Sequence, residues 1–328
     1  MSLKAEPAGE LRSLTAPARP RVALSARASR LTRIAWTHRW AYAIAAPTLV
    51  WFLVFKYVPL YYAQIAFKDF RPLLGVEGSP WIGLKNFESF VNSFYFGELI
   101  TNTVIFSGAR LVLGIPIAII LALALYETRY VALRRIVQTA SYLPHFLSWV
   151  IMFGILLAML SPGSGAINDL IRATGGTPVA FLSSPDWFRW VVIGSDIWKD
   201  TGWSTIIYLA ALLAIDPQLH EAAAVDGASR LQRIRHISMP GILPVIVLVT
   251  LLRLGHILEG GFQQIFVLYS LPVYSVGDII DTWVYRQGIL EFQFSLATAV
   301  GLFKGAIGLG LILVADRVAK RIAGRGLY

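Results

Sequence analysis

Six stretches of mostly apolar residues alternate with polar segments along the chain, and each is long enough to cross a bilayer as a helix. About 20 apolar residues in a helix span the hydrocarbon core of a membrane. A seventh run, from Ile265 to Val276, is shorter and contains Pro272, so we interpret it as a re-entrant or interfacial part of a loop. The pattern predicts an all-α, polytopic membrane protein with six transmembrane helices, at about residues 40–58, 101–125, 142–160, 190–215, 241–258 and 295–315.

Composition supports a membrane protein and restricts its chemistry. Of the 328 residues, 56% are hydrophobic and 15% are charged, whereas an ordinary soluble domain has about 25% charged residues. The chain contains no cysteine, which excludes disulfides, thiolate catalysis and cysteine-ligated metal sites. We divide it into a basic N-terminal tail (1–39), expected to be largely disordered, a transmembrane domain (40–315) and a basic C-terminal tail (316–328).

The distribution of positive charge predicts the orientation of the helices. Cytoplasmic loops of membrane proteins retain Lys and Arg. The two tails and the loops 126–141 and 216–240 hold 18 of the 29 cationic residues, whereas the alternate loops hold six. We therefore expect a multi-pass protein, surrounded by membrane lipid, with both termini in the cytoplasm. The N-terminal cations act as an orientation signal in this interpretation, so no nucleic-acid partner is expected.

The sequence contains no arrangement typical of an enzyme. The five histidines include no His-Glu-x-x-His pair, and no Gly-x-x-x-x-Gly-Lys-Ser/Thr phosphate-binding loop is present. Ser164 lies in a Pro-Gly-Ser-Gly turn with no histidine nearby in the sequence. We expect this chain to have no catalytic residue, no metal site and no cofactor of its own, and not to hydrolyse ATP by itself.

The loop between the fourth and fifth predicted spans is expected to form a short helix that faces the cytoplasm. Asp216 and Pro217 are typical of a helix start, a run of alanines follows, and Gly227 is suited to the turn after the helix. Small side chains allow another surface to approach the helix closely. We interpret the loop as a docking surface.

This loop resembles the EAA motif of the permeases of ATP-binding-cassette (ABC) importers. That family has Glu-Ala-Ala, a glycine four positions after the second alanine, and Ile-x-Leu-Pro nine residues later. This chain has Glu221-Ala222-Ala223, Gly227 and Ile237-Ser238-Met239-Pro240 at that spacing. Met239 replaces the usual leucine and nearly conserves its volume. The resemblance implies that the residues that couple this chain to an ATPase are Glu221, Ala222, Ala223 and Gly227.

Further strings look like the polysaccharide- and oligosaccharide-uptake branch of the sugar permeases: Trp81 to Phe87, Asp196 to Lys199, Gly261 to Phe266 and Ala299 to Lys304. This resemblance implies the type I importer fold, a bacterial inner membrane and transport by alternating access. It also implies partners, namely a second permease subunit, two cytosolic subunits that bind ATP and Mg, a periplasmic solute-binding protein and a carbohydrate substrate. We expect the second permease to differ from this one, which gives a heterodimer.

Two other functions are considered alongside the importer. A channel or an ion-coupled secondary transporter would need no ATPase, and the docking loop argues against it. An intramembrane enzyme would need a catalytic group, and none is recognised. We also find no internal repeat, which weakens a secondary transporter built from duplicated halves.

Ionisable side chains inside the predicted spans indicate a substrate pathway, because they usually face a bundle interior or a water-filled cavity. Four cations against two aspartates leave an excess of two positive charges, and Arg253 departs from the small or apolar residue of the family pattern. This predicts an anionic oligosaccharide, such as a uronate fragment of alginate. Structural pairing is the alternative, and Lys199 is expected to pair with Asp196 or Asp200. The candidate pathway residues are Arg110, Lys199, Asp200, Arg253, His256 and Lys304.

Aromatic side chains near the same spans form a second group of candidates. Their rings can stack on pyranose rings of a sugar. Packing inside the bundle or anchoring at the membrane interface is the alternative, and the spacing does not distinguish the two. These candidates are Trp198, Trp203, Tyr208, Phe262 and Tyr269.

Overall fold

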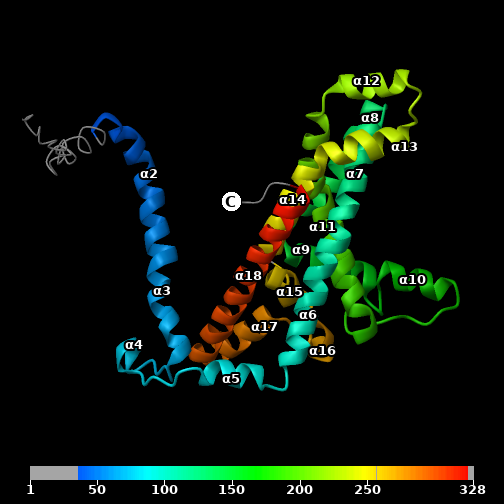
Figure 1. The fold of residues 1–328 in the computed structure, drawn as a ribbon. Helices are drawn as coiled ribbons and strands as arrows, with labels where there is room; N and C mark the ends of the chain where they lie inside the picture. Colours follow the sequence, from blue (N-terminus) through cyan, green and yellow to red (C-terminus); the bar gives the residue numbers. More distant parts are fainter. Residues whose placement is uncertain (1–35, 256, 324–328) are drawn as a thin grey trace, which may run out of the picture. The chain divides into compact units, whose positions relative to one another are not determined.

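The computed structural model describes residues 36–255 and 257–323. Within this part the regular secondary structure is helical, with one isolated β-bridge between Lys68 and Trp81. The chain divides into two compact units, residues 1–62 and 63–328. Each unit is described by itself, and Figure 1 gives the helix labels.

The described part of the first unit is one apolar helical run. It consists of α2 (Arg39–Phe52), the π-helical turn η1 (Leu53–Tyr57) and α3 (Val58–Tyr62), and the run continues to Phe67. No residue of these three elements is buried within the chain. A helix that is apolar all round needs lipid or another protein around it, which fits the first predicted span.

Four long helical runs organise the second unit. The first contains α6 (Phe96–Ala109), η3 (Arg110–Gly114, a π-helical turn) and α7 (Ile115–Glu127), and the second is α11 (Pro185–Leu213). The third contains α13 (Arg230–Arg233), η5 (Ile234–Ser238) and α14 (Met239–Gly255), and the fourth is α18 (Phe294–Ala323). α12 (Pro217–Val225) lies at one end of these runs, and α5 (Lys85–Val91) lies at the other (Figure 1).

The third predicted span is bent and does not form one continuous helix. Residues 142–160 fall on three elements, α8 (Val131–Tyr142), η4 (Leu143–Phe146) and α9 (Trp149–Leu160), and the chain bends by 110° between α8 and α9. Pro144 lies in the break, and the Ser148 side chain caps α9 by accepting a hydrogen bond from the amide of Ile151 at 3.3 Å. The apolar run therefore turns a corner, because proline and a capping serine end one helix and begin another.

The other predicted spans lie on helical runs. By length and composition, four helices among the described residues are suited to crossing a membrane, or five if the bent pair counts as one span. α11 is 29 residues long but carries Asp196, Lys199 and Asp200 in its middle, which lowers its hydropathy. It is nevertheless the central helix of the unit, because it packs against α7, α8 and α14.

Shorter elements connect the long runs. The apolar run 265–276, predicted as a re-entrant or interfacial part of a loop, forms the end of α15, then η7, which contains Pro272, and the start of α16. These connecting elements are η2 (Ala63–Phe67), α4 (Gly75–Gly78), α10 (Ala166–Ala173), η6 (Ile257–Glu259), α15 (Phe262–Leu268), η7 (Leu271–Val273), α16 (Tyr274–Gly277), α17 (Ile280–Tyr285) and η8 (Arg286–Leu290).

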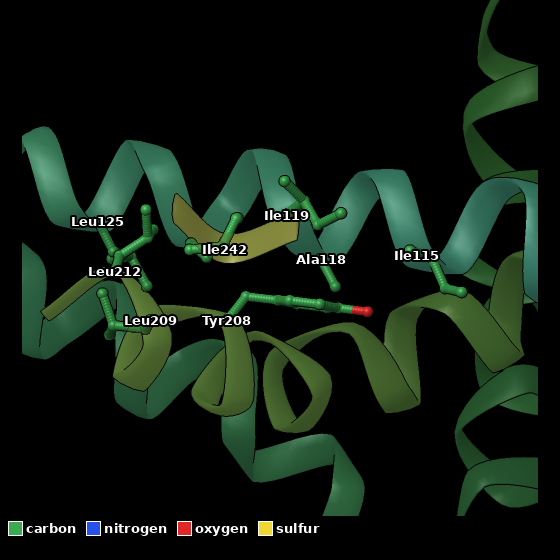
Figure 2. Packing of buried hydrophobic residues seen from close by; sticks show 9 residues of the cluster. Ile115, Ala118, Ile119, Leu125, Tyr208, Leu209, Leu212 and Ile242 are labelled. Carbon is green, nitrogen blue, oxygen red and sulfur yellow. The ribbon is translucent and has the colours of Figure 1, made fainter. Parts of the chain in front are cut away.

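Two hydrophobic clusters lie on either side of a polar layer in the helices. One cluster joins α7, α11 and α14 around Ala118, Tyr208 and Ile242 (Figure 2). The other joins α6, α9, α11 and α15 around Phe106, Val192 and Ile265. Along α11 the charged residues 196–200 fall between these two clusters, so the fold places them at an interior layer of the bundle.

Candidate functional site

A cavity of about 1040 Å³ occupies this polar layer. Its walls come from α6, η3, η4, α9, α11, α14, η6, α15, α17 and α18, so elements far apart in the sequence meet there. The described lining residues include four cations and four acids: Arg110, Lys199, Arg253, Lys304, Asp196, Asp200, Glu259 and Asp281.

Arg110 forms a rigid corner of the cavity. Its Nε lies 3.1 Å from Asp196 Oδ2, and its second guanidinium nitrogen donates to Gln264 Oε1 at 2.6 Å. Gln264 is itself buried and donates to the Val192 carbonyl at 2.7 Å and to Ser195 Oγ at 2.9 Å. The corner therefore ties η3, α11 and α15 together.

Gly261 is the residue that lets Arg110 reach this position. It has φ +84°, and a Cβ added there would overlap the guanidinium group of Arg110. Only glycine adopts this backbone conformation freely and leaves that space open. The turn before α15 and the position of Arg110 therefore depend on the same small residue.

A second cluster surrounds Asp200. Arg253 donates to Asp200 Oδ2 at 2.9 Å and to Ser204 Oγ at 2.6 Å, and the Ser204 hydroxyl donates to Asp200 Oδ2 at 2.8 Å. Nδ1 of His145 lies 3.6 Å from Asp200 Oδ1, and its ring stacks on Trp203 with centroids 4.5 Å apart. This cluster joins η4, α11 and α14.

The expected pairing of Lys199 with an aspartate is wrong. Its ammonium group donates to the carbonyls of Pro144, His145 and Leu147, at 3.2, 2.6 and 2.6 Å. These carbonyls lie at the end of η4, where the chain bends, and a cation stabilises the carbonyl groups at the end of a helix. Lys199 therefore holds the break between α8 and α9 against α11.

The expected excess of positive charge is also absent from the cavity. Lys304 pairs with Asp281 at 2.6 Å, and Glu259 lines the same cavity. Both acids belong to the segment between the fifth and sixth predicted spans, so counting charges inside the spans missed them. Among the described lining residues the formal charges of Lys, Arg, Asp and Glu balance.

The structure separates the aromatic candidates. Phe262 lines the cavity, together with Trp149 and Tyr285, which the sequence analysis did not select. Tyr208 is buried in the hydrophobic cluster of α7, α11 and α14, as Figure 2 shows. Trp198, Trp203 and Tyr269 are outside the lining.

Tyr269 packs instead with Tyr274, with ring centroids 4.9 Å apart. Burial, together with Tyr274, raises the pKa of Tyr269 to about 12. Its phenol therefore remains neutral at physiological pH.

The loop after α11 has the predicted local structure. Asp216 caps α12, since its side chain accepts a hydrogen bond from the Gln218 amide at 3.0 Å. No residue of α12 is buried, and Glu221 and Ala222 are exposed. Gly227 has φ +78°, and nothing lies within 4 Å of a Cβ added to it. The helix ends in a glycine turn and presents a free surface within this chain.

The sequence pattern of the family described as "Binding-protein-dependent transport system inner membrane component" matches residues 114–325. The chain belongs to this family. It is thus an inner-membrane permease subunit of an ABC importer, and the ATP-driven function is supported over an ion-coupled carrier or a channel.

Two similar proteins match this chain in sequence over 88% of its length. The polygalacturonan/rhamnogalacturonan transport system permease protein YteP of Bacillus subtilis is 43% identical over 290 residues, which are 88% of this chain and 90% of YteP. Protein LplB of the same organism is 41% identical over 88% of this chain and 91% of its own length.

Two solved structures are similar in fold as well as in sequence. One is a chain of a bacterial ABC transporter involved in the import of the acidic polysaccharide alginate, with 41% identity, a TM-score of 0.84 and coverage of 89% of this chain and 99% of that chain. The other belongs to a bacterial alginate ABC transporter in complex with an alginate pentasaccharide-bound periplasmic protein, with 39% identity, a TM-score of 0.84 and coverage of 91% and 100%.

The cavity contains most of the charged residues that the sequence analysis selected for a substrate pathway. Arg110, Lys199, Asp200, Arg253 and Lys304 meet there, and His256 lies outside the described residues. Gln264 and Gly261 were missed as individual residues, although both lie in a family-like string. The described residues contain no group of three His, Cys, Asp or Glu suited to holding a metal ion.

Proposed function

We propose that the permease carries acidic oligosaccharides, with uronate units, across the inner membrane. The observation that carries this proposal is the similarity to alginate-import permeases over about nine-tenths of the chain, together with a cavity in which two arginines and two lysines line the wall beside four acids. Guanidinium groups bind carboxylates through paired hydrogen bonds. The relative YteP supports the same class, because polygalacturonan is a polymer of a uronate.

The proposed complex contains five proteins. This permease pairs with a second, different permease; two cytosolic subunits bind ATP and Mg; and a periplasmic binding protein delivers the saccharide. Both termini and α12 face the cytoplasm, as the distribution of Lys and Arg predicts. A related transporter has been solved with its saccharide-bound periplasmic protein, which supports that partner.

The loop 216–240 is the proposed contact with the ATPase. Glu221, Ala222 and Ala223 would enter a groove on the ATPase, and Gly227 would form the turn that aims the helix. The exposed surface of α12 and the positive φ of Gly227 support this assignment. ATP-driven closure of the two ATPases would then draw the α12 helices together and open the cavity outward.

The complete complex in proteoliposomes is expected to import a uronate pentasaccharide at least about tenfold faster than a neutral pentasaccharide of equal length. The reason is that the carboxylates of the uronate saccharide can bind arginines of the cavity, whereas a neutral saccharide has no carboxylate. The measurement is uptake of labelled saccharide with ATP and binding protein. Equal uptake of the two saccharides would contradict the acidic substrate. Uptake without ATP would contradict the importer.

Phe262 is the aromatic candidate with a place in the cavity, so Phe262→Ala is expected to reduce substrate-stimulated ATP hydrolysis several-fold, by about 1 kcal/mol of lost stacking. Tyr269→Ala is the matched control, because Tyr269 is outside the cavity lining. Equal losses in both variants would remove the stacking role of Phe262. The basal ATPase rate checks that each complex is assembled.

A further inference from the structure

Two ion pairs of the cavity share one face of α11 but differ in how firmly they are built. Asp196 and Asp200 are four residues apart, so their side chains lie one above the other on the helix. Asp196 holds Arg110 of η3, and Asp200 holds Arg253 of α14. Each aspartate therefore joins α11 to a different helical run.

The Arg110–Asp196 ion pair is the less exposed of the two and is held by additional contacts. Its side chains are 22% and 20% exposed, and Arg110 uses two nitrogens, one for Asp196 and one for the anchored amide of Gln264. The guanidinium group fills the space where a Cβ of Gly261 would lie. An anion that replaced Asp196 would have to enter a nearly filled corner.

The Arg253–Asp200 pair is more open. Asp200 is 40% exposed and Arg253 is 29% exposed, and a single guanidinium nitrogen makes both contacts, to Asp200 and to Ser204. Within the described part of the chain, Nε and NH1 of Arg253 have no hydrogen-bond partner. NH1 lies 3.6 Å from the position that a Cβ of Gly114 would take, an ordinary van der Waals distance.

Asp200 also has partners that would remain if Arg253 turned to another anion. The hydroxyl of Ser204 donates to its Oδ2, and Nδ1 of His145 lies 3.6 Å from its Oδ1. A carboxylate left without any partner would make the exchange costly. Here the exchange leaves both groups with contacts.

We infer that Asp200 is an exchangeable counter-ion of Arg253, which a carboxylate of the saccharide displaces when it binds. Arg253 is then the residue that recognises the acidic group, and Asp200 sets the concentration of saccharide at which recognition occurs. Displacement removes this ion pair between α11 and α14, so an acidic saccharide breaks one link between the two helices that a neutral saccharide leaves in place. This inference rests on the proposed acidic substrate.

The test compares two neutralised aspartates in the complete complex in nanodiscs. Asp200→Asn removes the competitor of the saccharide, and we expect the Kd of a labelled uronate pentasaccharide, measured without binding protein, to fall about tenfold. Asp196→Asn, one helical turn away, is the comparison, and it is expected to lower this Kd by less, because Arg110 keeps its contact with Gln264. Competition by an unlabelled neutral pentasaccharide should be equally weak in all three proteins.

Several results would overturn the exchange. These are an unchanged or higher Kd for Asp200→Asn, an equal fall for Asp196→Asn, or no measurable saccharide binding in any protein. If Asp200→Asn does not assemble, Ser204→Ala serves instead, because it removes the hydroxyl that would still hold Asp200 after displacement. The Kd of this variant should rise, and an unchanged or lower Kd would overturn the exchange. A wild-type complex that imports acidic and neutral saccharides equally would refute the proposed function, whereas preferential acidic import with no tightening in Asp200→Asn refutes this inference alone.

Discussion

A Gly227→Val variant is expected to insert into the membrane and assemble but to lose about tenfold or more of its ATP-driven transport, because a left-handed backbone costs an L residue about 1–2 kcal/mol and a β-branched one more. Gly227 has φ +78°, and among the described residues beyond its two chain neighbours nothing lies within 4 Å of the added Cβ. The loss therefore arises from backbone strain, which would rebuild the turn and change the direction of α12. Saccharide uptake and ATP hydrolysis in proteoliposomes measure it.

The control for this variant is Gly227→Asn. Asparagine visits the left-handed region far more easily than valine, so most of the transport should return. If Gly227→Val transports at the wild-type rate, the assignment of α12 and its turn to the ATPase contact is wrong. A loss that is equally large for asparagine would instead show that the ATPase needs the bare glycine surface.

Local sequence patterns correctly predicted the helix caps and turns, because these features depend on residues adjacent in the sequence. The cap at Asp216 and the glycine turn at Gly227 both follow from the chemistry of one or two residues. The same rules also apply to the corner between α8 and α9, where Pro144 and Ser148 lie. That corner was missed because the apolar run 142–160 has the length of one span.

The pairing of charges did not follow from the sequence. Lys199 is adjacent to Asp200 in the sequence and one turn from Asp196, yet its ammonium group binds main-chain carbonyls. Those acceptors exist only because the chain bends at η4, a tertiary feature without a charged residue to mark it. Asp281 and Glu259 reach the cavity from a connecting segment, so a count confined to the spans omitted them.

Gly202 of α11 lies in close contact with the main chain of α8, a requirement for glycine that the sequence pattern did not reveal. A Cβ added to Gly202 would overlap the carbonyl group of Ser141 and approach the amide nitrogen of Tyr142 at 2.9 Å, both at the end of α8. These are main-chain atoms, so they have no side-chain rotamer with which to move away. Gly202 also lies between Asp200 and Ser204, so a shift of α8 disturbs the Arg253 cluster.

Gly202→Ala is therefore expected to destabilise the protein by about 1–3 kcal/mol, the usual cost of overpacking, and to reduce saccharide uptake. Gly194→Ala on the same helix is the matched control, because nothing lies within 4 Å of its added Cβ and Gly194 is exposed. Alanine favours a helix over glycine by about 1 kcal/mol, so this variant should be as stable as the wild type or more so. Thermal unfolding midpoints of the two variants in the same detergent provide the comparison. Equal midpoints would mean that α8 moves away from α11 without cost, and the close contact between the two helices would then be unnecessary for the fold.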